Sequence, residues 1–215
     1  MRSVYTWMTL ALVITGFVSM YVAKSYTLLS VIMQNSYGFL GDLIIAELGL
    51  VWYLSARINK MSFTTATVLF IVYSILNGVT LAFIFLIYTM SSIATTFFVT
   101  AGTFGVMALF GYVTKKDLTR IGSLCIMGVI GIIIASVVNM FLHNSMMDLI
   151  ISCIGVLLFV GLTAYDSQKI KQLLTADDIE VNETTQKIAL MGAMTLYLDF
   201  INLFLYLLRL LGDRK

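Results

Sequence analysis

Three carboxylates stand inside long apolar runs of this sequence. Asp199 lies near the middle of ALMGAMTLYLDFINLFLYLLRLLG (189–212), Glu47 lies within LGDLIIAELGLVWYLSARINK (40–60), and Asp166 closes a run that ends GLTAYDSQKI. An ionised carboxylate in hydrocarbon is costly unless it is paired, hydrated or protonated. Acids at such positions commonly face a cavity or an ion path. These three residues are therefore the candidates for chemistry.

The chemistry that such acids can perform depends on what they meet. Two carboxyl groups within hydrogen-bonding reach cannot easily both ionise, so they share a proton and titrate as one unit. A pair of this kind is a proton-sensitive latch. Glu47 cannot pair with Arg57, because about ten residues of straight helix separate them by roughly 15 Å. Glu47 therefore needs a proton, water or a partner on another helix.

A structural interpretation of each acid stays open beside the functional one. Asp199 shares a helical stripe with small and polar residues, which is also typical of polar contacts between packed membrane helices. Asp166 could be an interfacial carboxylate paired with Lys169 and Lys171. Its depth also differs from that of Asp199 by about 15 Å if both helices are straight. The two meet only if the last helix begins below the membrane surface or the preceding helix continues through KIKQLL.

The composition indicates which elements position these acids. Hydrophobic residues form 60% of the 215 residues and charged ones 11%, against about 25% charged in soluble domains. Such a chain cannot cover a water-facing surface, so its solvent is the lipid bilayer. We predict an all-α integral membrane protein, one polytopic domain over 1–215, with seven transmembrane helices. The expected spans are about 5–23, 39–56, 63–89, 92–113, 121–142, 147–169 and 187–211.

Other features narrow the class of protein. The net charge is +2 and the basic residues are scattered, so no nucleic-acid surface is expected. Neither the single histidine nor the two cysteines, which lie in apolar runs, form a metal-ligand pattern, and we expect no metal site and no cofactor. Asn77 and Asn139 are expected to make hydrogen bonds between helices, and Asp148 to begin a helix.

Lysine and arginine counts predict the orientation in the membrane. In a seven-span chain the N-terminus and three loops share one side, which carries the larger number of basic residues and should be cytoplasmic. The C-terminus, with Arg209, Arg214 and Lys215, then lies on the other side, unless the last helix is short or re-entrant. The residues on the first side are Arg2, Arg57, Lys60, Lys115, Lys116, Arg120, Lys169, Lys171 and Lys187.

Three stretches of the sequence carry a family resemblance. GLTAYDSQKIKQL followed by LYLDFINLFLYLLRLLG resembles the C-terminal signature of the Bax-inhibitor-motif family, in particular its bacterial branch. TFFVTAGTFGVMALFGYVTKKDLT is similar to its fourth span and the loop after it. The resemblance implies six helices packed around a central C-terminal helix and a pH-sensitive calcium leak. It also implies that Asp166 and Asp199 form the pH sensor, with Glu47 and Arg57 as ion-path or gate partners.

We therefore expect a calcium leak channel in a bacterial plasma (inner) membrane, with calcium as the permeant ion. The alternative is a non-conducting regulator that binds other membrane proteins, such as a membrane protease. An intramembrane aspartyl protease also pairs a YD motif with a second aspartate. Here the second motif is LYLD rather than GxGD and the chain has no proline, so we expect no enzyme. Proton-coupled transport is disfavoured because internal repeats are not evident.

Overall fold

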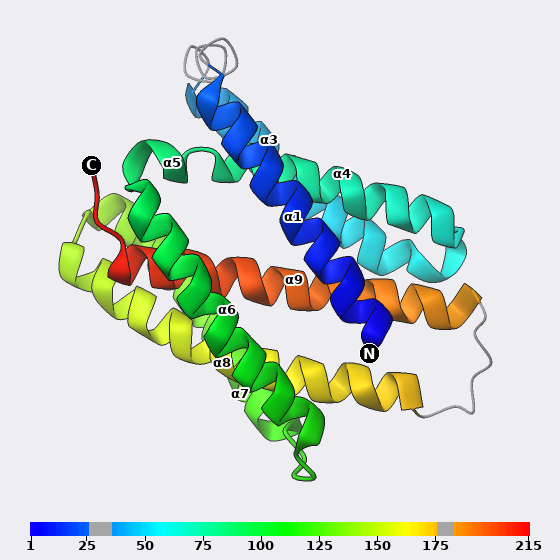
Figure 1. The fold of residues 1–215 in the computed structure, drawn as a ribbon. Coiled ribbons are helices and arrows are strands. Elements are labelled where there is room, and N and C mark those ends of the chain that lie inside the picture. Colours follow the sequence, from blue (N-terminus) through cyan, green and yellow to red (C-terminus); the bar gives the residue numbers. More distant parts are fainter. Residues whose placement is uncertain (26–35, 176–182) are drawn as a thin grey trace. The chain divides into compact units, whose positions relative to one another are not determined.

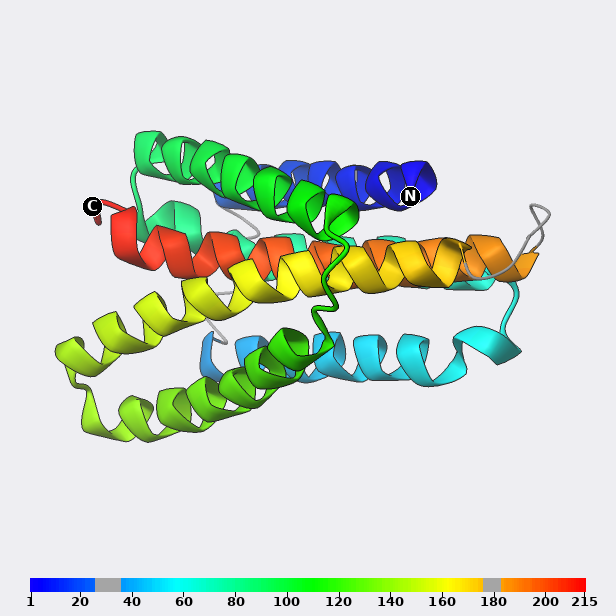
Figure 2. The same ribbon diagram turned by 90° about the horizontal axis from the view of Figure 1, so that it is seen from below.

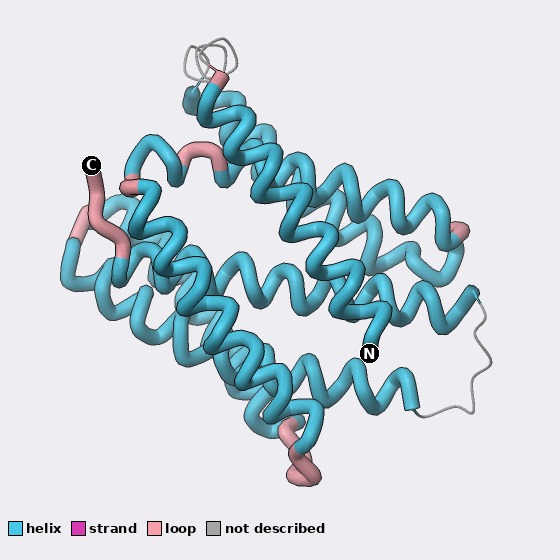
Figure 3. Tube along the Cα trace, in the orientation of Figure 1, coloured by secondary structure: helices cyan, strands magenta, loops and turns pink. Residues whose placement is uncertain are grey.

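The computed structural model describes residues 1–25, 36–175 and 183–215, with the side chains of residues 36–40 and of Asn59 outside the description. Within these ranges the chain is helical and contains no β-strand (Figure 3). The helices are α1 (Arg2–Lys24), α3 (Ser36–Arg57), the short 3-10 helix η1 (Ile58–Lys60), α4 (Phe63–Leu81), α5 (Ile84–Ile87), α6 (Met90–Val113), α7 (Thr119–Leu142), α8 (Ser145–Thr175) and α9 (Glu183–Leu211).

Six helical segments in the described ranges are long and apolar enough to cross a membrane: α1, α4 with α5, α6, α7, α8 and α9. Their outer faces carry large apolar side chains, of which Phe98 and Phe141 are among the most exposed. Exposed apolar faces of this extent fit lipid as the solvent, which confirms an all-helical membrane protein. The seventh expected span, which corresponds to α3, stays a prediction.

The chain divides into two compact units, and each is described by itself. The first comprises Met1–Tyr88, 177–197 and Lys215; the second comprises Thr89–Ala176 and Leu198–Arg214. The expectation of one domain over 1–215 stays a prediction. The helix α9 is continuous and contributes its first half to the first unit and its second half to the second (Figure 1).

In the first unit α4 packs against both α1 and α3. Ser62 begins α4 by accepting a hydrogen bond from the Thr65 backbone N–H at 3.2 Å, as a helix N-cap does. The sequence predicts one span over 63–89, but α4 ends at Leu81 and α5 starts at Ile84. The side chains of α4 that face into this unit include the polar residues of the candidate site.

In the second unit α8 packs against both α6 and α7. A short turn joins α7 to α8, and the two helices run side by side as a hairpin (Figure 2). Asn139 at the end of α7 donates to Asp148 in the first turn of α8 at 2.7 Å, and to the Asn144 carbonyl oxygen at 3.2 Å. Both expectations for these residues, an interhelical hydrogen bond and a helix start, are confirmed.

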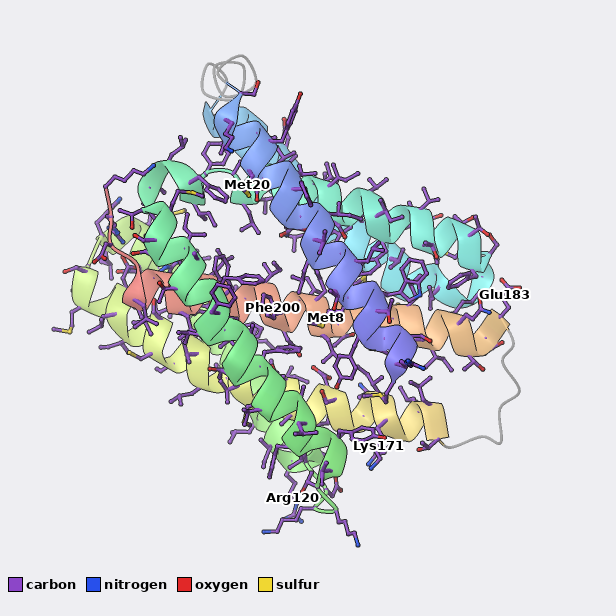
Figure 4. All side chains as sticks on the ribbon, in the orientation of Figure 1. Met8, Met20, Arg120, Lys171, Glu183 and Phe200 are labelled. Carbon is purple, nitrogen blue, oxygen red and sulfur yellow. The ribbon has the colours of Figure 1, made fainter. Side chains whose placement is uncertain are left out.

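Helix α9 is the most buried of the six candidate spans. About two thirds of its most apolar stretch is buried, against at most 39% in the others. In the second unit Phe200 of α9 (labelled in Figure 4) packs edge to face against Phe97 and Phe104 of α6, with ring centroids 5.6 and 5.4 Å apart. The packing of six helices around α9 stays a prediction.

Candidate functional site

Asp166 and Asp199 face each other in the second unit. Asp166 is half-buried on α8, Asp199 is 5% exposed on α9, and their carboxyl groups lie within hydrogen-bonding reach of one another. The Oδ2 atom of Asp199 is buried with no donor partner in the described part of the chain. A buried acceptor of this kind is costly unless a proton is supplied to it. A proton held between the two carboxyl groups would satisfy it.

Helix α8 is longer than the apolar run that predicts it. The expected span ends at about residue 169, but the helix continues through KIKQLL to Thr175. Of the two arrangements that would bring the acids together, this is the extension of the preceding helix. Asp166 therefore lies about two and a half turns inside the end of α8, not at the end itself.

The lysines after Asp166 do not form an ion pair with it in the described residues. Lys171 donates from Nζ to the Tyr112 carbonyl oxygen of α6 at 2.8 Å and lies over the Tyr112 ring. Lys169 contributes a positive charge near Asp166, and its Nζ lies 5.7 Å from the centroid of the Tyr165 ring. In the described residues neither lysine therefore replaces Asp199 as the close partner of Asp166.

Gln168, two residues after Asp166, ties α8 to the loop between α6 and α7. Its Oε1 accepts from the Leu118 backbone N–H at 2.9 Å, and its Nε2 donates to the Lys116 carbonyl oxygen at 2.8 Å. The side chain is buried and both ends of the amide are satisfied. Sequence reasoning missed this residue, although it lies inside the quoted motif YDSQK; a glutamine at the end of an apolar run was the available signal.

Two glycines let α6 and α7 approach the segment of α8 that carries Asp166. A Cβ at Gly111 of α6 would collide with the main chain of Ala164, and one at Gly122 of α7 would enter the Tyr165 ring. Because the contacted residues immediately precede Asp166 on α8, the position of its carboxyl group depends on how closely three helices pack.

Glu47 is buried in the first unit and has partners on α4. It is 9% exposed, and its Oε1 accepts from the Thr80 hydroxyl at 2.6 Å. The Asn77 amide also lies within reach of this carboxylate and donates to the Tyr73 hydroxyl at 3.5 Å. Glu47 thus has the partner on another helix that the sequence required. Thr80 was missed, although it lies three residues after Asn77 on the same helical face.

Arg57 lies at the end of α3, exposed, with its guanidinium carbon 6.0 Å from the centroid of the Tyr53 ring. The structure does not bring it to Glu47, in agreement with the distance expected along one helix. Its assignment as a gate partner stays a prediction.

A second buried polar cluster of the first unit joins α1, α4 and the first half of α9. The hydroxyl groups of Thr15 and Tyr197 lie 2.7 Å apart, and Thr15 donates to the Ser74 carbonyl oxygen at 2.9 Å. The Tyr197 ring packs edge to face against Tyr73 and Phe70. This cluster orders the half of α9 that precedes Asp199 on the chain.

The described residues contain no group of three or more histidine, cysteine, aspartate or glutamate side chains that could hold a metal ion. The approach of the carboxyl groups of Asp166 and Asp199 allows exchange of a proton between them. At Glu47 the available chemistry is exchange of hydrogen-bond partners around one carboxylate.

Comparison with known proteins agrees with the resemblance of the motifs. The family model described as "Inhibitor of apoptosis-promoting Bax1" matches residues 1–215. The chain is 49% identical over 215 residues to Inner membrane protein YbhL of Escherichia coli K12, covering 100% of this chain and 92% of that protein. It is 44% identical over 217 residues to Uncharacterized protein RP147 of Rickettsia prowazekii, covering 100% and 89%. It is also 35% identical over 211 residues to an uncharacterized membrane protein of Streptococcus pyogenes serotype M1, covering 97% and 90%. The chain therefore belongs to the Bax-inhibitor-motif family of membrane proteins.

Proposed function

We propose that this protein is a pH-sensitive calcium leak whose gate is the pair Asp166 and Asp199. The observation that carries the proposal is the approach of two carboxyl groups on neighbouring helices, one of them buried with an acceptor atom that lacks a donor. The motifs that hold these residues, YDSQK and LYLD, are those in which the family resemblance is most specific.

The physical basis of the gate is the number of protons on the pair. With one shared proton the carboxyl groups hydrogen-bond and hold α8 against the second half of α9. When that proton leaves, two negative charges repel at short range in a low dielectric, with an energy of a few kcal/mol. Such an energy shifts a two-state equilibrium by orders of magnitude. We expect a closed state at lower pH and a more open state as pH rises.

The calcium path is assigned to carboxylate and other oxygen ligands, because calcium prefers hard oxygen atoms. Glu47 is proposed to line this path and Arg57 to be a gate partner after the latch is released. Calcium is the permeant ion and the bilayer the surrounding solvent. The excess of basic residues on one side supports a cytoplasmic N-terminus, and the name of the Escherichia coli relative supports an inner-membrane location.

The test is calcium flux into liposomes that contain only the purified protein, measured from about pH 5 to about pH 8. Wild type should conduct without an energy source, with flux that depends on pH. Asp166→Asn and Asp199→Asn should each flatten the pH profile, and the double variant should resemble either single one, because the pair acts as a unit. Asp42→Asn, an exposed carboxylate on α3, is the matched control.

Two results would overturn the proposal. Flux no greater than that of empty liposomes at every pH would leave the non-conducting regulator of other membrane proteins as the better account. If both single variants keep the wild-type pH profile, the pair is not the pH-sensitive latch, and Asp199 has only a structural hydrogen-bonding role.

A further inference from the structure

The loop between α6 and α7 (114–118) and the first turn of α7 present three exposed cations: Lys115, Lys116 and Arg120. Arg120 extends away from the helices at this end of the second unit (Figure 4). The ion pair found among the described residues joins Lys187 to Glu183 and involves none of these three. The cations are therefore uncompensated by close contact with a described carboxylate.

The only acid of this loop is already engaged within it. Asp117 accepts from the Thr119 hydroxyl at 2.6 Å and from the Thr119 backbone N–H at 2.9 Å through the same oxygen. These bonds, the hydroxyl first, hold the pKa of Asp117 below its ordinary value, with a smaller contribution from the charge of Arg120. Asp117 thus stays ionised near neutral pH, and the surface still carries a net positive charge.

Side chains of α8 hold the backbone of this basic loop through hydrogen bonds. Gln168 binds the Leu118 N–H and the Lys116 carbonyl oxygen, and Lys171 binds the carbonyl oxygen of Tyr112 just before the loop. Neither contact uses the side chains of Lys115 or Lys116, which remain exposed. A loop held through its backbone presents its cations with little conformational entropy left to lose on binding.

The neighbouring surface is apolar. Val113 at the end of α6 is 64% exposed and Leu124 on α7 is 65% exposed. Because both helices are candidate membrane spans, these side chains face acyl chains while the loop lies at the level of the headgroups. An occupant with an anionic head and an apolar tail matches both parts. A free phosphate or an acidic peptide would match only the cations.

We propose that Lys115, Lys116 and Arg120 form a docking surface for the headgroup of an anionic phospholipid. Attraction of basic residues to anionic lipid next to a membrane helix is worth up to about fivefold in affinity for each cation. Three cations on a preformed loop should therefore give a severalfold preference for anionic over zwitterionic lipid at this position, and salt should weaken it.

The experiment uses the full chain in phosphatidylcholine liposomes that contain a trace of spin-labelled phosphatidylglycerol or spin-labelled phosphatidylcholine. The fraction of motionally restricted label gives the relative association of the two lipids. The test variant is Lys115→Gln/Lys116→Gln/Arg120→Gln. The matched control, Arg2→Gln/Lys24→Gln/Lys60→Gln, removes the same charge from exposed residues elsewhere.

Wild type and the control should show a severalfold preference for phosphatidylglycerol, and the test variant should lose most of it. Lys115→Arg/Lys116→Arg/Arg120→Lys should keep it. If the triple glutamine variant does not fold, Lys115→Glu alone should lower the preference. An equal loss in test and control variants would assign the effect to net charge and overturn the proposal. So would a wild type without lipid preference that binds a free acidic peptide, since the partner would then be a protein.

Discussion

Gly111 provides a direct test of the packing that positions Asp166. An alanine Cβ there would meet the Ala164 carbonyl carbon at 2.7 Å and its Cα at 2.9 Å, and would lie closer still to the carbonyl oxygen. Carbon atoms pack at about 3.5 Å or more, so α6 and α8 must separate by at least about 0.8 Å to clear the carbonyl carbon. Clearing the carbonyl oxygen requires a larger separation. Because the obstacle is backbone rather than a flexible side chain, the helices themselves must move.

Gly111→Ala should therefore lower the free energy of unfolding by about 1–3 kcal/mol, the usual cost of overpacking. Gly105→Ala is the matched control on the same helix, since its Cβ would meet nothing within 4 Å. That control should be neutral or stabilising by up to about 1 kcal/mol through helix propensity. Unfolding in mixed micelles, titrated with a denaturing detergent and followed by circular dichroism, measures both.

Equal stability of the two alanine variants would refute the close approach of α6 and α8. If the approach is real, Gly111→Ala should also change the pH profile of calcium flux, because Ala164 lies two residues before Asp166. Gly105→Ala should leave that profile unchanged.

Three further predictions concern single side chains. Gln168→Leu leaves the buried Leu118 N–H and the part-buried Lys116 carbonyl oxygen without their partner. It should lower the free energy of unfolding by about 1–3 kcal/mol in the same assay, and wild-type stability would contradict this. His143 ends α7 in the left-handed conformation, with φ 51°, which glycine adopts at a lower cost than other residues. His143→Gly should therefore raise the free energy of unfolding by up to about 1 kcal/mol. A loss of stability would show that contacts of the His143 side chain outweigh this backbone effect. Glu47→Gln keeps the shape and removes the charge, so it should reduce calcium flux in a folded protein; unchanged flux would return Glu47 to a structural role.

The positions of most helices could be predicted from the sequence, because an apolar run long enough to cross a bilayer almost always forms a transmembrane helix. The runs 92–113 and 121–142 end at the same residues as α6 and α7. Hydropathy did not predict the helix ends correctly in two situations. In one a helix continues into polar residues, and in the other a helix ends within an apolar segment. Helix α8 continues through KIKQLL, since a helix that leaves the bilayer needs no apolar surface, and α4 ends at Leu81 within a uniformly apolar stretch.

The acidic residues of the candidate site could also be predicted from the sequence, but the residues that contact and position them could not. A carboxylate inside an apolar run stands out because its burial is expensive. Thr80 does not stand out, because a threonine in a membrane helix is ordinary. Gln168 gives only a weak signal, because a glutamine at the end of an apolar run is commonly a surface residue. What makes them part of the site is the backbone geometry that brings each to a buried group on another element.

This difference explains why the approach of Asp166 and Asp199 could be expected only from the family resemblance. Helical periodicity gives the face of each residue but not its depth, and depth is set by where the helix begins and ends. The extension of α8 to Thr175 places Asp166 inside the helix, where Gln168 and Ala164 fix its height against the α6–α7 loop and α6. The proposed proton latch thus depends on uncharged residues that hold one carboxyl group at the level of the other. Changes at Gly111 or Gln168 should therefore alter the pH response while both aspartates remain in place.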